Sequence, residues 1–137
     1  MKTKRIGLVL SVAALWWITG EICVQAGDAL RPGDQLKPNE KITSPNGQFT
    51  LIYQGDGNLV VYGPNSSVMW ATYKGSSPGM FTMKGDGNAV VYDASGAAIW
   101  ANDKSGNPGS YLQMQDDGNL VEYNAQNKPV WASQGGL

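Results

Sequence analysis

The sequence repeats one unit three times, and this repetition constrains the fold more than any other feature of the chain. Each unit contains Asp-Gly-Asn, then an apolar run that ends in Tyr, and later Trp-Ala. The aspartate and the tryptophan are 14 residues apart in every copy, and successive copies start 30 and then 31 residues apart. The copies align without gaps over residues 54–62, 84–92 and 115–123. A domain built from them should have approximate threefold symmetry.

Each unit is typical of β-structure and leaves no room for a helix. Apolar side chains alternate before each aspartate, as in Leu51 and Tyr53, and β-branched residues follow it. Asp-Gly-Asn between the two halves favours a tight turn, and a second turn precedes the tryptophan. The pattern predicts three to four short strands per unit. We expect the three tryptophans, with their large apolar surfaces, to meet near the common axis: Trp70, Trp100 and Trp131.

The segment before the first repeat has a spacing of its own. Leu30, Leu36 and Ile42 are six residues apart and are separated by turn-forming sequences that contain proline. This predicts short strands near residues 28–31, 35–37 and 41–44. We expect one of them to complete the sheet of another repeat, because that would close the ring and protect a sheet edge.

Composition excludes several classes of function. The chain has no histidine and one cysteine, Cys23, so Ser-His-Asp and Cys-His catalysis, Cys/His zinc sites and a disulfide framework are excluded. A formal net charge of -1 argues against a nucleic-acid partner, which normally requires a basic face. Each repeat offers one carboxylate to an outward site, whereas glycoside hydrolysis needs two. We therefore expect a protein that is not an enzyme.

Residues 1–26 have the order of a secretory signal peptide. A short basic head precedes an apolar run from Ile6 to Gly20, and Val24-Gln-Ala26 is suited to a signal peptidase. An uncleaved signal anchor and lipid attachment at Cys23 are the alternatives, although the apolar run is shorter than the ~20 residues that span a bilayer. Cleavage would leave residues 27–137 as a secreted single domain without a membrane span.

The repeated polar residues are spaced to share one face. Residues two apart on a strand point to the same side. In the first copy this places five side chains in one outward row: Gln54, Asp56, Asn58, Val60 and Tyr62. Leu59 and Val61 then face the core. In the third copy Glu122 takes the place of Val61, and we expect it where the strand leaves the core.

An outward row of this kind suits a pyranose sugar. Amides donate and accept hydrogen bonds, a carboxylate accepts strongly from hydroxyls, and an apolar side chain can contact the C–H patch of the ring. A purely structural repeat is the other interpretation, because the same residues are ordinary in turns and strands. Calcium fits poorly, since Val60 stands where an EF-hand loop would need a third oxygen ligand.

The triplicated pattern Gln-x-Asp-x-Asn-x-Val-x-Tyr with a following Trp-Ala resembles the bulb-type (monocot, snowdrop-like) mannose-binding lectins over about residues 29–134. The resemblance implies a β-prism II fold, with three four-stranded antiparallel sheets around a pseudo-threefold axis. It also implies mannose binding without metal or cofactor. Two carbohydrate sites would be formed by Gln54, Asp56, Asn58, Val60 and Tyr62, and by Gln115, Asp117, Asn119, Val121 and Tyr123.

The resemblance also assigns roles and partners. Asp56 and Asn58 would hold the axial 2-hydroxyl, Gln54 the 3-hydroxyl and Tyr62 the 4-hydroxyl, with Val60 against the ring carbons. The partners would be mannose-type glycans or glycoproteins, and the chain would be able to form a homodimer. A non-lectin interaction or antimicrobial, bacteriocin-like module on the same scaffold is the alternative.

The second copy departs from the pattern at one position. Lysine replaces the glutamine, and an ammonium group donates hydrogen bonds but cannot accept them. We therefore expect a weak or altered carbohydrate site here, formed by Lys84, Asp86, Asn88, Val90 and Tyr92.

Overall fold

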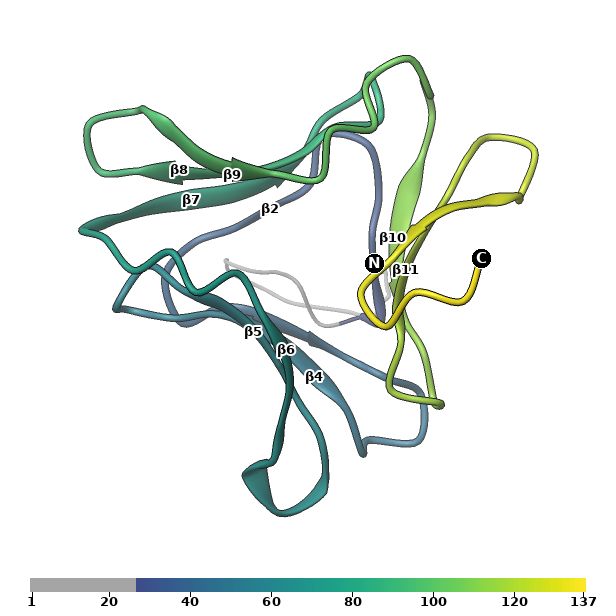
Figure 1. Cartoon of the computed structure of the whole chain (residues 1–137), viewed down its shortest axis with the longest axis horizontal. Coiled ribbons are helices and arrows are strands. Elements are labelled where there is room, and N and C mark those ends of the chain that lie inside the picture. The colour runs from purple at the N-terminus through teal and green to yellow at the C-terminus, as the bar shows by residue number, and fades with distance from the viewer. Residues whose placement is uncertain (1–26) are drawn as a thin grey trace, which may run out of the picture.

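The computed structural model describes residues 27–137, and the predicted signal peptide lies outside these residues. Twelve strands form three four-stranded antiparallel sheets around a common axis, as Figure 1 shows. The all-β, β-prism II architecture expected from the sequence is therefore confirmed. The described part of the chain has no α-helix, only a short 3-10 turn at Pro64–Ser66, and no segment of it forms a helix that could cross a membrane.

Each repeat supplies three strands of one sheet. The first sheet has the order β3-β4-β5-β6, with β3 at Lys41–Thr43, β4 at Thr50–Tyr53, β5 at Leu59–Tyr62 and β6 at Val68–Ala71. The second has the order β2-β7-β8-β9, with β2 at Gln35–Leu36, β7 at Pro78–Met83, β8 at Ala89–Asp93 and β9 at Ala98–Ala101. The third has the order β1-β10-β11-β12, with β1 at Ala29–Leu30, β10 at Tyr111–Met114, β11 at Leu120–Tyr123 and β12 at Pro129–Ala132.

The segment before the first repeat visits all three sheets in turn. The strands β1, β2 and β3 confirm the three that the sequence predicts, and each becomes the fourth strand of a different sheet. Two of them, not one, complete the sheets of later repeats. Leu30, Leu36 and Ile42 are fully buried, so a step of six residues carries the chain from one sheet to the next and adds one core side chain each time. This segment ties the repeats together around the axis.

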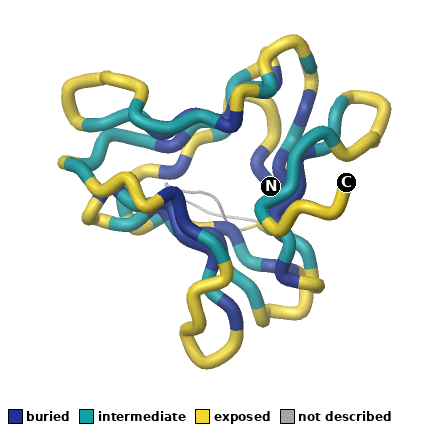
Figure 2. The backbone as a smooth tube through the Cα atoms, in the orientation of Figure 1, coloured by how far each residue is buried: buried dark blue, intermediate teal, exposed yellow. Residues whose placement is uncertain are grey.

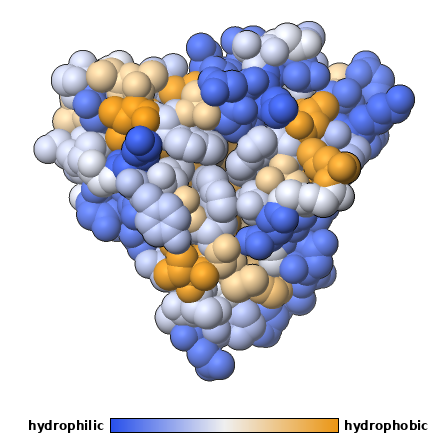
Figure 3. Space-filling model, viewed as in Figure 1, coloured by the Kyte–Doolittle hydropathy of each residue, from blue (hydrophilic) through white to orange (hydrophobic). Residues whose placement is uncertain are grey.

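The core lies between the three sheets. Figure 2 shows buried backbone on the inner stretches and exposed loops at the outer corners. Trp70, Trp100 and Trp131 pack against this core and meet one another edge to face, with ring centroids 5.5, 5.6 and 6.1 Å apart. This confirms the expected tryptophan cluster. On the face seen in Figure 3, hydrophobic residues form small separate patches.

Glu122 contradicts the expectation that it sits where a strand leaves the core. It lies within β11, opposite Leu112 and Trp131, and it is fully buried. Its Oε1 accepts a hydrogen bond of 2.6 Å from Asn102 Nδ2, which reaches it from the second sheet, whereas Oε2 has no partner within the described residues. Burial raises the pKa of this carboxyl, and the hydrogen bond from Asn102 partly offsets that effect. At the position where the other repeats have a buried valine, Glu122 thus forms a buried hydrogen bond that links the third sheet to the residue after β9 of the second.

Candidate functional site

A tight hairpin places the aspartate and the asparagine of each repeat. In the first repeat Gln54 N donates to Asn58 O at 2.9 Å and Gly57 N donates to Gln54 O at 3.0 Å, and Gly57 has a φ of +83°. This is a three-residue loop that closes with a glycine in the left-handed region. The same two bonds recur at residues 84–88 and 115–119. The turn predicted from Asp-Gly-Asn is therefore confirmed in all three copies.

The hairpin, and not a single strand, explains why the repeated polar residues of each copy lie on the same side. The even spacing predicted that residues 54–62 share one face of a strand, but β5 begins only at Leu59. Gln54 extends the preceding strand and lies across the hairpin from Asn58, while Asp56 lies in the loop. The expected parity holds within β5 itself, because Leu59 and Val61 belong to the core cluster and Val60 does not.

The aspartate carboxylate is held by its own loop. Asp56 Oδ1 accepts a hydrogen bond of 2.9 Å from Asn58 N, and Asp86 and Asp117 accept the same bond at the same length. This contact fixes the side chain without using the second carboxylate oxygen, for which no bond is recorded among the described residues. Because the aspartates are exposed, that oxygen is available to accept from a ligand.

The asparagine amide is oriented by the segment after each tryptophan. Asn58 Oδ1 accepts from Thr72 Oγ1 at 2.8 Å and from Lys74 N at 3.2 Å. Since its oxygen is occupied, Asn58 must present its NH₂ group as the free donor. In the third repeat the oxygen of Asn119 accepts equivalent bonds from Ser133 and from the backbone of the next residue, and in the second repeat Asn88 accepts from Lys104 N. An acceptor and an oriented donor therefore stand side by side in each copy.

The residue after Trp-Ala supports the site, and the sequence pattern did not predict this role. It is Thr72, Asn102 and Ser133 in the three repeats, a small polar residue each time. In the first and third repeats its hydroxyl also accepts from the first backbone N–H of the strand after the hairpin, at Leu59 in β5 and Leu120 in β11. In the second repeat the amide oxygen of Asn102 accepts from Ala89 N, the first residue of β8. The sequence feature that could have predicted this role is the hydroxyl or amide side chain that recurs two residues after each tryptophan.

Glutamine and tyrosine meet in two of the three sites. Gln54 Nε2 donates to the Tyr62 hydroxyl, and Gln115 Nε2 donates to the Tyr123 hydroxyl. Each glutamine thus keeps its amide oxygen as an acceptor beside a phenol whose own hydrogen is free to donate. Val60 and Val121 are 3% exposed and form the apolar floor between these polar groups. In the first and third copies the glutamine and the tyrosine are therefore joined by a hydrogen bond, whereas the aspartate and the asparagine lie in the hairpin before the strand that carries the valine.

The second copy keeps part of this arrangement. Asp86, Asn88 and Val90 have the same hairpin, hydrogen bonds and burial as their counterparts. Lys84 makes no hydrogen bond to Tyr92, nor any ion pair with the described residues. A cavity of about 520 Å³ lies over this copy, and its lining contains Lys84 and Tyr92 but not Asp86 or Asn88.

The cavity at the third copy is lined by different segments of the chain from the cavity at the second copy. A cavity of about 410 Å³ is lined by Gln115 and Asp117 together with Gln113, Pro45 and Asp116. Gln113 is held by Asp28 Oδ2 at 2.8 Å, and Asp116 Oδ1 accepts a bond of 2.8 Å from Asn46 N. The amino-terminal segment and the loop before β4 therefore border this site. Sequence alone gave no indication of these neighbours.

The chemistry of the sites is that of hydroxyl recognition. Among residues 27–137, histidine, cysteine and carboxylate side chains form no group of three that could hold a metal ion. Each site instead combines a charged acceptor, an amide donor, a phenol and an apolar floor. Groups that donate and accept within a few ångströms of one another match a ring that carries several hydroxyls.

Comparisons with known proteins agree with this picture. No protein-family model and no curated protein matches the chain, but solved structures do. The snowdrop (Galanthus nivalis) mannose-specific agglutinin, solved with methyl-α-D-mannoside, is 34% identical, with a TM-score of 0.66 over 80% of this chain and 98% of that one. A monomeric monocot mannose-binding lectin from Gastrodia elata is 31% identical, with a TM-score of 0.70 over 80% and 99%.

A Marasmius oreades lectin is also similar, with 28% identity and a TM-score of 0.74 over 78% of this chain and 90% of that one. The matched proteins are lectins, which bind carbohydrates and do not turn them over. The fold, the triplicated hairpin and the identity to two lectins that the chain covers almost completely lead to one conclusion. The chain belongs to the bulb-type mannose-binding lectin family.

Proposed function

We propose that this chain is a secreted lectin that binds mannose or mannose-containing glycans without a metal. The first and third copies are the principal sites, formed by Gln54, Asp56, Asn58, Val60 and Tyr62 and by Gln115, Asp117, Asn119, Val121 and Tyr123. The likeness to snowdrop agglutinin, whose structure contains a mannoside, supports the choice of sugar. The described residues begin at Gly27, after the predicted signal peptide, so secretion rests on the sequence of residues 1–26.

One observation carries the proposal: the same acceptor–donor pair is built in all three repeats. The loop bond to Asp56 and the two bonds to the Asn58 oxygen leave one carboxylate oxygen and one NH₂ group side by side. A sugar hydroxyl can donate to the first and accept from the second. An epimer that moves this hydroxyl would leave both groups without a partner, which costs about 1–3 kcal/mol.

The arrangement of the sheets favours polyvalent ligands. The three sheets face away from the axis in three directions, as Figure 1 shows. Sites on different sheets therefore cannot share one small sugar, but they can engage separate branches or separate glycoproteins. Weak single sites would gain apparent affinity in this way.

Calorimetric titration with methyl α-D-mannoside tests the proposal. The variant Asp56→Asn with Asp117→Asn keeps an oxygen for each loop bond but replaces the free carboxylate oxygen by a donor. We expect the affinity to fall about tenfold or more, because a hydrogen bond to a charged group is lost at both sites. Asp103→Asn, which removes the same charge at an exposed position after β9, should bind normally.

Wild-type protein that gives no heat at millimolar mannoside, or a double variant that binds as well as wild type, would contradict the proposal. Secretion is tested separately by amino-terminal sequencing of the exported protein, which we expect to begin at Gly27. The homodimer stays a prediction, and light scattering of the mature chain measures it.

A further inference from the structure

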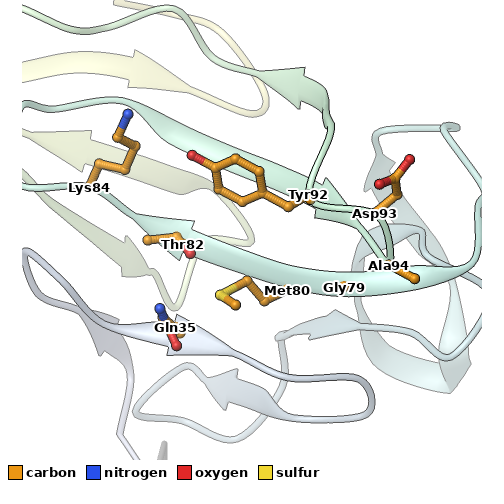
Figure 4. Close-up of a pocket in the computed structure, with 9 residues that line it drawn as sticks. Gln35, Gly79, Met80, Thr82, Lys84, Tyr92, Asp93 and Ala94 are labelled. Atoms are coloured by element: carbon orange, nitrogen blue, oxygen red, sulfur yellow. The ribbon is translucent and has the colours of Figure 1, made fainter.

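The cavity over the second repeat differs in shape and charge from the sites of the other repeats. It is lined by residues of three strands and the turn after β8, among them Gln35, Thr82, Lys84, Tyr92 and Asp93. Figure 4 shows Lys84 and Tyr92 side by side along the sheet, with Asp93 beyond Tyr92 and Gln35 on the neighbouring strand. At about 520 Å³ the cavity falls within the range of small-molecule sites, roughly 300–1,000 Å³.

Lys84 supplies this cavity with an unneutralised positive charge. Its side chain is half-buried, and among residues 27–137 no carboxylate lies within the 4.0 Å of an ion pair. In the other repeats a glutamine at this position donates to the tyrosine hydroxyl. Here the described residues leave both the ammonium group and the Tyr92 hydroxyl without a hydrogen-bond partner. Two donors with no internal acceptor thus border the same end of the cavity.

The negative charge of Asp93 lies at the other end. Asp93 Oδ1 accepts from Ser95 N at 2.9 Å, from Ser95 Oγ at 2.6 Å and from Ala97 N at 3.0 Å. These bonds turn the carboxylate toward its own turn, and they hold its pKa below the usual range. Tyr92 separates it from Lys84 in Figure 4. The cavity therefore has a positive end and a negative end, and it would orient a ligand that carries one anionic group.

We propose that this cavity binds an acidic saccharide, a hexose that bears one oxyanion as a carboxylate or a sulfate ester, with the oxyanion against Lys84 and Tyr92. The proposal rests on the carbohydrate-binding function proposed above and assigns the second repeat a different ligand class. A neutral sugar loses an acceptor when lysine replaces glutamine, whereas an oxyanion gains a charge-assisted hydrogen bond. Gln35 and Thr82 provide groups for the remaining hydroxyls.

The test is a site-resolved NMR titration of the ¹⁵N-labelled mature chain. The probes are methyl α-D-mannoside, the corresponding mannosiduronic acid and mannose 6-sulfate, and the reporters are the amides of Lys84, Gln54 and Gln115. At the second repeat we expect the acidic sugars to bind about fivefold more tightly than the neutral one, because a bond to a charged group exceeds a neutral one by roughly that factor. Added salt should weaken only the acidic sugars. Comparison of carboxylate with sulfate identifies which oxyanion is preferred.

Reciprocal variants sharpen the result. Lys84→Gln should remove the preference for acidic sugars at the second repeat, and Gln54→Lys should create it at the first. Asp93→Asn should strengthen acidic binding, because it removes the negative end while keeping an acceptor for the turn. Lys128→Gln, which removes an exposed lysine from the turn before β12, should change nothing.

The outcomes separate this proposal from the preceding one. Equal affinity for neutral and acidic sugars at the second repeat, or a preference that survives Lys84→Gln, would overturn the acidic site while leaving mannose binding at the other repeats intact. No response to mannoside at Gln54 and Gln115 would overturn the proposed lectin function instead. An acidic response that appears equally at all three repeats would show general charge attraction and would also overturn the acidic site.

Discussion

The first and second repeats share a backbone but differ in two side chains that matter. On the outer face the first repeat has Gln54 bonded to Tyr62, whereas the second has Lys84 with no such bond. Behind the sheet the first repeat has Thr72 bonded to its site asparagine, whereas the second has Asn102, which reaches into the core to Glu122. The comparison shows that threefold symmetry is a property of the hairpins and the core positions. The outer cavities and the polar links between sheets are free to diverge.

The largest expected effect comes from the polar link in the core. Asn102→Ala should destabilise the protein by about 3 kcal/mol, because it leaves the buried Glu122 carboxyl without its hydrogen bond. Chemical denaturation measures the change. The double variant Glu122→Val with Asn102→Thr restores the residues of the first repeat, and we expect it to be at least as stable as wild type. A cost near zero for Asn102→Ala would show that the link is not needed.

The hairpin glycines should be next in effect. A Cβ at Gly57 would lie 2.5 Å from Ser76 O, and the residue has a positive φ, so Gly57→Ala should cost about 2 kcal/mol or more. Gly96 also has a positive φ but no atom lies within 4 Å of its Cβ position. Gly96→Ala should therefore cost only about 1 kcal/mol. Equal losses of thermal stability in the two variants would mean that the close approach to Ser76 can relax.

A smaller effect is expected at the residue that orients the asparagine. Thr72→Val removes one bond to Asn58 Oδ1 and should weaken mannoside binding at the first repeat about fivefold. Ser133→Ala should do the same at the third repeat through Asn119. Site-resolved titration measures each repeat separately. If either variant weakens both sites alike, the hydroxyl acts through overall stability and not through amide orientation.

The smallest expected effect is a pH dependence of stability. The pKa of Glu122 is raised above its ordinary value of 4.5 by burial. The side chains of Asn102 and Ser110 and the charge of Lys104 oppose the shift, and the charge of Asp86 adds to it. The folded protein thus holds this proton more tightly than the unfolded chain. The contribution of Glu122 to stability is therefore fully present below pH 4.5 and is lost as pH rises through the folded-state pKa.

Melting temperatures of wild type and Glu122→Gln, compared from pH 4 upward, measure this loss. The melting temperature of the wild type should fall relative to that of the variant as pH rises through the folded-state pKa, and above that pKa the two curves should be parallel. Parallel curves throughout would show that the carboxyl titrates normally in the folded state.

Much of the fold follows from particular residues. Asp-Gly-Asn with its left-handed glycine specifies a closed hairpin through local backbone geometry, and this makes the turns predictable. The alternation around Leu59 and Val61 fixes which side of β5 is buried. Leu30, Leu36 and Ile42 predict three strands. Ile42 pairs with the next strand along the chain, but the strands of Leu30 and Leu36 pair with strands more than forty residues away. The local sequence pattern does not indicate which distant strand each of them pairs with.

The contacts that build the candidate site were harder to predict than the hairpins. Spacing by two grouped Gln54 with Tyr62, but the structure brings them together differently, because Gln54 crosses a hairpin to reach Tyr62. Thr72 was overlooked because its role depends on how the chain returns past Asn58 after a strand and a turn. The partner of Glu122 could not be predicted for the same reason, because Asn102 directly follows β9, a strand of a different sheet.

The sequence by itself determined the threefold repeat, the hairpins and the alternation between buried and outward side chains, since each of these depends on neighbours a few residues apart. The tertiary structure alone decided which amino-terminal strand joins which sheet, which atoms orient the asparagine amides, and why a carboxyl can stand among the core side chains. Those features depend on contacts between segments distant in the chain, and such contacts exist only once all three sheets have closed around the axis.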